Sequence, residues 1–397
     1  MTNPAAATRE PPPYLAAALT GVIVLGIYIL TLAPTTAFWD TSEYIAAARV
    51  LGIPHPPGNP LFVLLAHTWA ALPLVADYAV RINLFAAVTS AGSAALWFLV
   101  ADRWMRDVVT VKWARLAAAF AGILVGATSW TVWNQSTVNE KVYTVSILST
   151  ALTTWLGVHW ADDAPGQHRD RWLVLIAYVF ALSSTNHMMG VLAAPAVAVY
   201  VLLTEPTMLL KPWVLWLGLL LALAVSGSWT VLVDGPLEQQ VVLGIVLALL
   251  AGYTVWRDAS ELRRRMFWLA VLAVVVGISL NYVFLPIRSA QFPAINEGEP
   301  RNWDALLQVL NRAQYGKPPL NVRQADFVSQ LGNYLQYFNW QFARDWGRVG
   351  GLVATWLFSI LGLAGGITLW WRDRRAFWAS TTLMVTMTLA LVTCLNF

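Results

Sequence analysis

Long apolar runs, separated by short polar or Pro- and Gly-containing segments, recur along almost the whole chain. Each run has about twenty residues, which is enough for a helix to cross a hydrocarbon core of about 30 Å. The pattern therefore predicts an all-α integral membrane protein with a single transmembrane domain over residues 1–397. We expect about eleven spans, near residues 15–33, 81–101, 114–133, 142–160, 171–187, 189–204, 212–233, 239–256, 266–286, 351–371 and 376–396.

The composition agrees with this pattern. Hydrophobic residues make up 58% of the chain and charged residues 12%, with a mean hydropathy of +0.59. Soluble domains contain about 25% charged residues, so a soluble globular protein is excluded. The net charge of +4 is of the kind that basic cytoplasmic loops supply, and we expect no nucleic-acid partner. The single cysteine, Cys394, excludes an internal disulfide and a cysteine-based metal site.

The basic residues provide a test of the span assignment, because Lys and Arg collect on the cytoplasmic side of membrane proteins. Eleven spans place three basic clusters on one side, near residues 103–115, 257–265 and 372–375. That side is then cytoplasmic, and the N-terminus lies there too. The apolar segment Leu61 to Leu74 is short and follows Pro-rich sequence. Counting it as a span would put the clusters on opposite faces, so we expect it to be re-entrant or interfacial.

Two long segments, residues 33–80 and 287–350, then lie on the external side. Long aqueous loops between spans are commonly functional. The first contains Asp40 and Glu43, three residues apart. If a helix starts at Thr41, Asp40 is its N-cap and Glu43 its N3 residue, which is the spacing of a capping box. Alternatively, Asp40 accepts a proton from an acceptor hydroxyl while Glu43 orients it or shares its charge. The two interpretations are compatible.

A series of motifs in consistent order resembles a known family. The motifs are Trp39-Asp40-x-x-Glu43, His55-Pro-Pro-Gly-x-Pro-Leu-Phe62, Asn139–Tyr143, Asn186-His187, Leu285–Ser289, Pro293–Glu297 and Leu310–Gly316. Together they are similar to a family of bacterial multi-pass membrane proteins, formerly a domain of unknown function, that is related to the eukaryotic transmembrane protein O-mannosyltransferase. The members of that family continue beyond the point where this chain stops, so it is either a short member or the membrane half of a longer protein.

The resemblance implies the architecture of a C-type glycosyltransferase (GT-C). It further implies an inverting enzyme that moves a sugar, mannose, from a polyprenyl-phosphate donor to a hydroxyl. The expected acceptor is Ser or Thr of an exported protein, on the periplasmic side of a bacterial inner membrane. In this interpretation Asp40 is the catalytic base and Glu43 supports it.

Transfer from a lipid phosphate also needs cations near the departing phosphate. The expected donor-phosphate ligands are Arg288, Arg312, Lys141 and His187, and the expected substrate-pocket residues are Trp39, His55, Glu140, Asn296, Glu297, Gln314 and Tyr315. Alternatives stay open for several of them. Arg288 follows directly on a span and could be a snorkelling anchor, Arg312 could belong to a solvated loop after a helix from Trp303 to Asn311, and Glu140 or His187 could cap helix ends.

Two further questions stay open from the sequence. Acidic residues and histidines on one face could supply ligands for a divalent cation such as Mg or Mn, but no spacing resembles a metal motif, so no cofactor is predicted.

A transporter or flippase of lipid-linked sugars is the alternative function, as is a GT-C enzyme with a glycolipid or cell-wall acceptor. Transporters place polar residues near the middle of spans, whereas here Arg81, Asn83 and Asn281 lie toward the external ends, which favours an enzyme.

Overall fold

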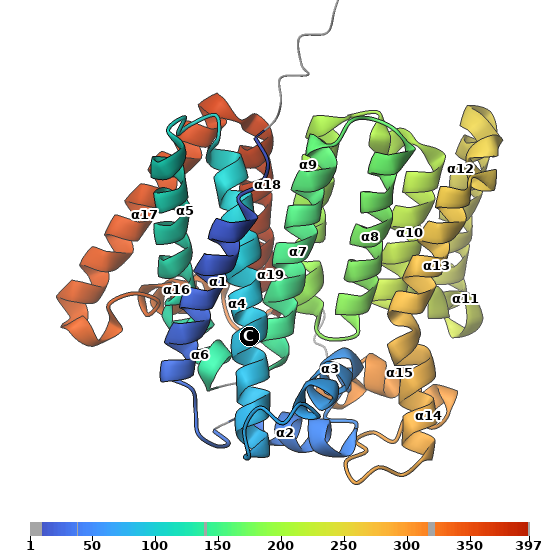
Figure 1. The fold of residues 1–397 in the computed structure, drawn as a ribbon. Helices are drawn as coiled ribbons and strands as arrows, with labels where there is room; N and C mark the ends of the chain where they lie inside the picture. The colour runs from blue at the N-terminus through green and yellow to red at the C-terminus, as the bar shows by residue number, and fades with distance from the viewer. Residues whose placement is uncertain (1–9, 38, 139–140, 317–321, 396–397) are drawn as a thin grey trace, which may run out of the picture.

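The computed structural model describes residues 10–37, 39–138, 141–316 and 322–395, and these form an almost entirely helical molecule (Figure 1). Among these residues, the β-type backbone pairing consists of one isolated parallel bridge, between Ile53 and Asn296. The elements are α1 Tyr14–Leu30, α2 Thr41–Val50, α3 Pro60–Ala70, α4 Tyr78–Met105, α5 Lys112–Ala127, α6 Trp130–Thr137, α7 Val142–Asp162, α8 Gln167–Ser184, η1 Met188–Val191, α9 Ala194–Thr204, η2 Met208–Leu210, α10 Pro212–Ser226, η3 Ser228–Thr230, α11 Val231–Asp234, α12 Leu237–Asp258, η4 Ala259–Arg263, α13 Arg265–Ser279, η5 Leu280–Phe284, α14 Leu285–Ala290, α15 Trp303–Leu310, η6 Ala313–Tyr315, α16 Phe327–Asn339, η7 Arg344–Trp346, α17 Gly347–Arg372, α18 Arg374–Val385, η8 Thr386–Ala390 and α19 Leu391–Leu395.

Within the described residues, five helices are long and apolar enough to cross a membrane, and six if the bent pair α5–α6 counts as one span. The all-α membrane fold is thereby confirmed. Every range assigned to a span contains helix, but several of these helices are short or interrupted, so the full number of eleven spans and the GT-C architecture stay predictions. The bend of 68° between α5 and α6 follows two hydroxyl side chains that bond back to the helix, Thr128 to the Leu124 carbonyl and Ser129 to the Gly126 carbonyl.

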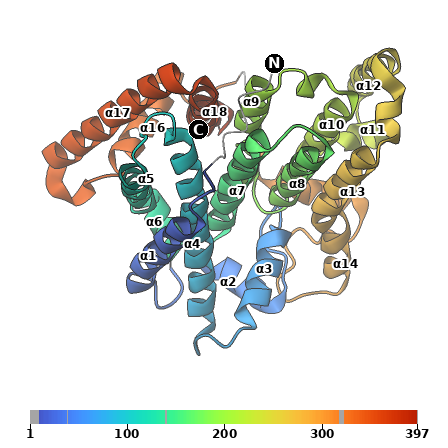
Figure 2. The ribbon, with the colours of Figure 1, turned by 45° about the horizontal axis from the view of Figure 1, so that its top comes forward.

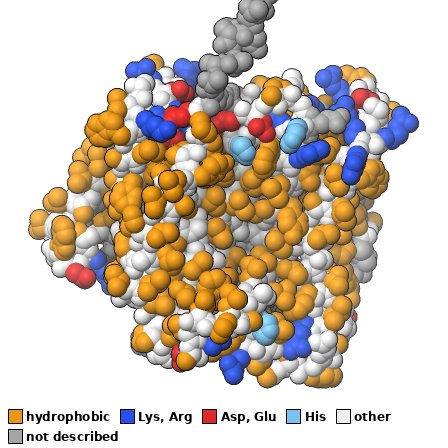
Figure 3. Space-filling model, viewed as in Figure 1, with side chains coloured by type: hydrophobic (Ala, Val, Ile, Leu, Met, Phe, Trp, Pro, Cys, Tyr) orange, Lys and Arg blue, Asp and Glu red, His pale blue; other side chains and the backbone are white. Residues whose placement is uncertain are grey.

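The long helices run side by side between two distinct ends (Figures 1 and 2). One end, the basic end, has the α4–α5, α12–α13 and α17–α18 connections with their three basic clusters. The other, the site end, has α2, α3, α14 and α15. Hydrophobic side chains cover the surface between the two ends, and charged side chains gather toward them (Figure 3). The arrangement agrees with the prediction that the basic clusters share one side; which side faces the cytoplasm stays a prediction.

Small side chains let the central helix α4 approach its neighbours closely. The face of α4 toward its neighbours is rich in buried alanine and serine, among them Ala87, Ser90 and Ala94. Hydroxyl groups add interhelical bonds: Thr89 donates to the Thr144 hydroxyl at 2.8 Å, and Ser93 donates to the Ile147 carbonyl at 3.0 Å. Contacts of this kind hold helices together inside a bilayer, where the hydrophobic effect does not drive their association.

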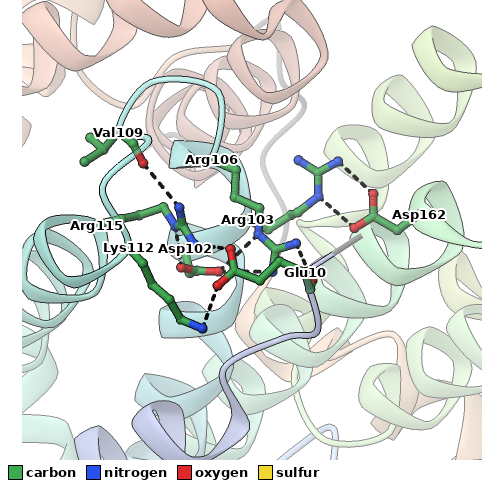
Figure 4. Close-up of polar contacts among 8 residues, drawn as sticks. All are labelled: Glu10, Asp102, Arg103, Arg106, Val109, Lys112, Arg115 and Asp162. Atoms are coloured by element: carbon green, nitrogen blue, oxygen red, sulfur yellow. Dashed lines mark hydrogen bonds and ion pairs between the residues drawn. The ribbon is translucent and has the colours of Figure 1, made fainter. Parts of the chain in front are cut away.

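An ion-pair network ties the helices together at the basic end (Figure 4). Asp102 is fully buried and accepts a hydrogen bond from Arg115 Nε at 2.7 Å. Glu10, ahead of α1, accepts from Arg115 Nη2 at 2.7 Å. Arg103 of α4 forms a two-bond pair with Asp162 of α7, both distances being 2.7 Å. The network therefore joins the N-terminal segment to α4 and α5, and α4 to α7.

The segment Leu61–Leu74 is expected to be re-entrant or interfacial, and that position in the membrane stays a prediction. The segment forms α3, which at 11 residues is only about 16 Å long. It lies at the site end beside α2 (Figure 1). Its buried residues Phe62, Val63 and Ala66 belong to one core cluster with Tyr44 of α2 and Phe85 of α4. This packing fixes α2, and with it the acidic motif, on the end of the bundle.

Candidate functional site

Helix α2 begins at Thr41 with Asp40 at the N-cap position, so the condition for the capping-box interpretation is met. The predicted capping box is wrong. The Asp40 side chain makes no cap hydrogen bond, and Glu43 turns instead toward His55. Its two carboxylate oxygens accept hydrogen bonds from the His55 backbone N–H at 2.7 Å and from His55 Nδ1 at 2.6 Å. Two short charge-assisted bonds outweigh the single bond that a capping box would give Glu43.

The Glu43–His55 pair sets the charge of the site. The hydrogen bond that His55 donates to Glu43 raises the pKa of His55, and the charges of Glu43, Asp40 and Glu297 add to this. For Glu43, burial raises the pKa, but the hydrogen bonds from His55 outweigh it and the net pKa is lowered. His55 Nε2 lies 3.8 Å from an Asp40 carboxylate oxygen. The Asp40 side chain is 46% exposed, against 23% for Glu43, so Asp40 is the carboxylate that an incoming molecule meets.

Hydrogen bonds fix the His55-Pro-Pro-Gly loop to the bundle. The Tyr44 hydroxyl donates to Asn59 Oδ1 at 3.2 Å, and Asn59 Nδ2 donates to the Asn186 carbonyl. Asn186 in turn donates to the Val142 carbonyl at 2.8 Å. Gly58 has a φ of +87°, which favours glycine. Sequence reasoning missed Tyr44 and Asn59 as positioning residues; the Gly-Asn turn before α3 is the local signal that could have indicated Asn59.

The second long loop joins the first at this site. The Ile53 N–H donates to the Ile295 carbonyl at 2.8 Å, and the Glu297 N–H donates to the Ile53 carbonyl at 2.9 Å. The backbones approach so closely at Gly52 that a Cβ there would lie 2.8 Å from Ile295 Cβ. Glu297 is exposed and its charge acts on His55. The structure therefore brings Glu297 to the site, as the resemblance implies.

Asn296 and Arg288 have structural partners here. Asn296 Nδ2 donates to the Ser289 carbonyl at 3.3 Å. The Arg288 guanidinium donates to the Leu51 and Val50 carbonyls at 2.7 and 2.9 Å, at the C-terminal end of α2. A cation there satisfies free helix carbonyls and complements the helix dipole. This geometry favours an anchoring role for Arg288, and its contact with a phosphate stays a prediction.

A cavity of about 640 Å³, within the range typical of ligand sites, is lined on one side by Pro57 of the His55-Pro-Pro-Gly loop. Its lining includes Pro57, His187, Asn281 and Arg312. Two predicted phosphate ligands, His187 and Arg312, are thereby brought together. Arg312 is exposed, with its guanidinium 4.9 Å from the centre of the Tyr315 ring.

His187 is a neutral hydrogen-bonding group at physiological pH. Burial, together with the positive charges of Arg312 and His55, lowers its pKa to about 4. His187 Nδ1 accepts from the Met189 N–H at 3.1 Å, so the proton of the neutral ring is on Nε2. The ring lies edge-on to Tyr143, with centroids 4.9 Å apart. His187 can thus donate a hydrogen bond to an anion without carrying a charge.

The remaining predicted residues divide into three groups. Trp39, at 77% exposed, and Gln314 and Tyr315 are on the surface. Lys141 is fully buried at the start of α7, where burial lowers its pKa to about 7. It is not one of the residues that line the cavity described above. Glu140 lies outside the described residues.

Asp40, Glu43 and His55 are the described residues that could hold a cation, with one ligand atom of each within 4.8 Å of the others. The hydrogen bond of Glu43 to His55 Nδ1 occupies one carboxylate oxygen and one ring nitrogen. Asp40 and His55 Nε2 remain for a metal, fewer groups than a dedicated protein site provides. The absence of a cofactor stays a prediction.

The fold and this site define a class: an integral membrane protein with a carboxylate–histidine site and a ligand-sized cavity at one end of its helix bundle. Comparison with known proteins specifies the relationship. Residues 40–209 match the family model described as the protein O-mannosyl-transferase TMEM260 N-terminal domain. The match begins at Asp40 and includes Glu43, His55 and His187.

The chain is related to the eukaryotic protein O-mannosyltransferase. It is 28% identical over 260 residues to the protein O-mannosyl-transferase TMEM260 of Mus musculus, an alignment that covers 63% of this chain and 34% of the mouse protein. The chain therefore spans about a third of the length of this curated relative. No solved structure gives a significant match.

Proposed function

We propose that the protein is a glycosyltransferase that moves mannose from a polyprenyl-phosphate donor to a hydroxyl of a protein acceptor, with its active site at the site end on the external side. The observation that carries the proposal is the position of Asp40, whose exposed carboxylate lies 3.8 Å from a histidine held by Glu43. Pro57, which follows closely on that histidine in the chain, lines the cavity that also contains Arg312 and His187. The relation to a protein O-mannosyltransferase supports the sugar and the acceptor.

The proposed reaction is an inverting displacement at the sugar. An Asp40 oxygen takes the proton of the acceptor hydroxyl, whose oxygen forms a bond to the anomeric carbon. The bond from that carbon to the phosphate oxygen breaks, and the lipid phosphate leaves with the bonding electrons. Proton removal by a positioned carboxylate contributes typically about 10²- to 10⁴-fold to a rate.

Glu43 and His55 act as positioning residues. Glu43 fixes the imidazole through Nδ1, so that Nε2 faces Asp40 at 3.8 Å and the Tyr44 hydroxyl at 3.4 Å. The raised pKa of His55 favours its protonated form, whose positive charge would lie beside the Asp40 carboxylate. This charge holds the base in one position at the mouth of the site.

Arg312 and His187 would hold the phosphate. A guanidinium can bind two phosphate oxygens at once, and the neutral His187 ring has an Nε2–H to donate. Both groups are aimed at charge that grows on the phosphate as its bond to the sugar breaks, which is where electrostatic stabilisation lowers the barrier.

The polar residues near span ends do not support transport across the membrane. Arg81 donates to the Val75 and Ala70 carbonyls at 2.6 and 2.9 Å. Asn83 donates to the Ala33 carbonyl at 2.7 Å. Both side chains hold loops at the site end, so they do not form a path through the bundle.

The test uses the full-length chain in proteoliposomes with polyprenyl-phosphate mannose labelled in the sugar, together with exported proteins as acceptors. We expect label to leave the lipid and to appear in protein, released by cleavage of an O-linkage. Label recovered in a glycolipid or polymer would contradict the protein acceptor. Intact labelled donor moved across the bilayer, with no covalent transfer, would contradict the enzyme and favour the flippase.

A further inference from the structure

The helix α13 continues through η5 into α14 at the site end (Figure 1). Pro286 lies inside this continuous helix and has no N–H, so it cannot donate to the Tyr282 carbonyl one turn before it. The turn that precedes it, η5, is π-helical, and the Leu285 N–H donates to the Leu280 carbonyl. Single π-helical turns inside α-helices occur frequently at functional sites. The sequence thus builds an irregular helical turn at the site end.

Packing fixes η5 to the loop that contains His55. Leu285, directly after the turn, is fully buried in one core cluster with Ile53. Ile53 shortly precedes His55 in the chain, so this cluster joins the turn to the first long loop. On another side, the Tyr282 ring lies edge-on to Trp229, with ring centroids 5.1 Å apart. The side chains of η5 are therefore held in a defined position relative to His55.

Asn281 of η5 lines the cavity of about 640 Å³ that also contains His187 and Arg312. Its Oδ1 atom is buried and has no hydrogen-bond partner within the described residues. Buried side-chain oxygens are mostly hydrogen-bonded, and one that is not destabilises the folded state. A bound molecule that donates a hydrogen bond to Oδ1 would remove this destabilisation, so the atom favours a ligand with a donor group at this point.

The hydrogen-bond type of each polar group divides the cavity. The Arg312 guanidinium and the Nε2–H of neutral His187 donate, and phosphate oxygens accept from such groups. The Oδ1 atom of Asn281 is itself an acceptor, so a phosphate diester, which has no proton to donate, does not pair with it. A sugar has several hydroxyl groups that donate. The acceptor hydroxyl is not available for this bond, because in the proposed reaction its proton goes to Asp40.

We propose that Asn281 accepts a hydrogen bond from one hydroxyl of the sugar that is transferred, and that the enzyme selects its donor through this bond. This inference rests on the proposed function, since it takes the bound molecule to be a sugar linked to a lipid phosphate. The phosphate then lies with Arg312 and His187, and the sugar lies toward η5. A water molecule on Asn281 is the competing explanation, and the experiment distinguishes the two.

The test changes both halves of the proposed bond. The full-length chain in proteoliposomes receives polyprenyl-phosphate mannose or a series of analogues that each lack one hydroxyl of the sugar. In the wild type, loss of one particular hydroxyl should lower kcat/KM about tenfold. Asn281→Ala should lower kcat/KM for the complete sugar by about the same factor. Loss of that hydroxyl should then cost Asn281→Ala nothing further, because the bond is already absent.

Two features of the comparison separate a lost contact from lost structure. Each ratio is taken within one variant, so a smaller folded fraction neither imitates nor hides the coupling. Gln308→Ala is the matched control, because Gln308 is an exposed amide of α15 at the same end and is not one of the residues that line the cavity. It should respond to every analogue as the wild type does.

Binding without an acceptor protein tests the same bond without catalysis. The wild type should bind the complete donor about tenfold more tightly than the analogue that lacks the critical hydroxyl, and Asn281→Ala should bind both equally. If the wild type uses these donors but Asn281→Ala discriminates among them as the wild type does, Asn281 holds water and the assignment is overturned while the proposed function stands. If the wild type neither binds nor transfers from any of them, the proposed function fails and the assignment fails with it.

Discussion

Replacing Glu43 with glutamine tests whether the Glu43–His55 pair positions the site. The carboxylate accepts two hydrogen bonds from His55, at 2.7 and 2.6 Å. Glutamine keeps one acceptor oxygen, so one charge-assisted bond is lost, which is worth about 1.5–3 kcal/mol. If this bond positions Asp40 for catalysis, its loss should lower the rate of sugar transfer about ten- to a hundredfold.

The pH dependence separates positioning from simple loss of structure. Glu43 raises the pKa of His55. The stability that this pair contributes is therefore complete below about pH 6.5 and is lost as the pH rises through the raised pKa of folded His55. In Glu43→Gln the pKa of His55 falls, so the alkaline decline of activity should begin at a lower pH.

The assay is the label-transfer rate between about pH 5.5 and 8.5, with thermal unfolding in detergent as a check of folding. Glu238→Gln is the matched control, because Glu238 is exposed in the first turn of α12. A Glu43→Gln rate within twofold of wild type, or an alkaline limb at the same pH, would refute the positioning role.

Three further predictions concern stability. Asp102→Asn should cost about 3 kcal/mol in unfolding measurements, because it leaves the buried Arg115 with less compensation; a loss below 1 kcal/mol would contradict the network. Gly52→Ala should cost about 1–3 kcal/mol, since its Cβ would meet Ile295 at 2.8 Å, whereas alanine at an open glycine should be neutral. The pKa of His187 is lowered to about 4, so the stability that the neutral ring contributes is complete above about pH 6.5 and is lost as the pH falls toward 4. Over that pH range the unfolding temperature of His187→Asn should therefore fall less than that of the wild type.

Regular features of the fold followed from sequence patterns. Apolar run length predicted the membrane class and the helix α7, expected at 142–160 and observed at Val142–Asp162. Segment length set the short helix α3, Pro60–Ala70, apart from the longer helices, while its position relative to the membrane stays a prediction. These features are local, because run length, Pro and charge act within one segment. The bend between α5 and α6 was missed, since it depends on which backbone carbonyls two hydroxyls select.

The candidate site was predicted in part. The acidic residues and His55 were predicted as site residues, but the capping-box interpretation gave Glu43 the wrong hydrogen-bond partner. Capping spacing describes one helix turn, whereas the competing donor is His55, twelve residues further along. The contacts of Arg288 with Val50 and Leu51 join positions more than 230 residues apart. A single sequence has no signal for such a contact, so the residue's position after a span indicated only a phosphate or headgroup role.

The central claim is that Asp40 takes the proton of the acceptor. The most direct measurement is label transfer from polyprenyl-phosphate mannose to protein by Asp40→Asn, compared with wild type and with Asp304→Asn, which changes an exposed carboxylate of α15 at the same end. We predict that Asp40→Asn still binds the donor and unfolds at the wild-type temperature but transfers at least about a hundredfold more slowly, while Asp304→Asn is unaffected. Full transfer by a folded Asp40→Asn variant would contradict the account.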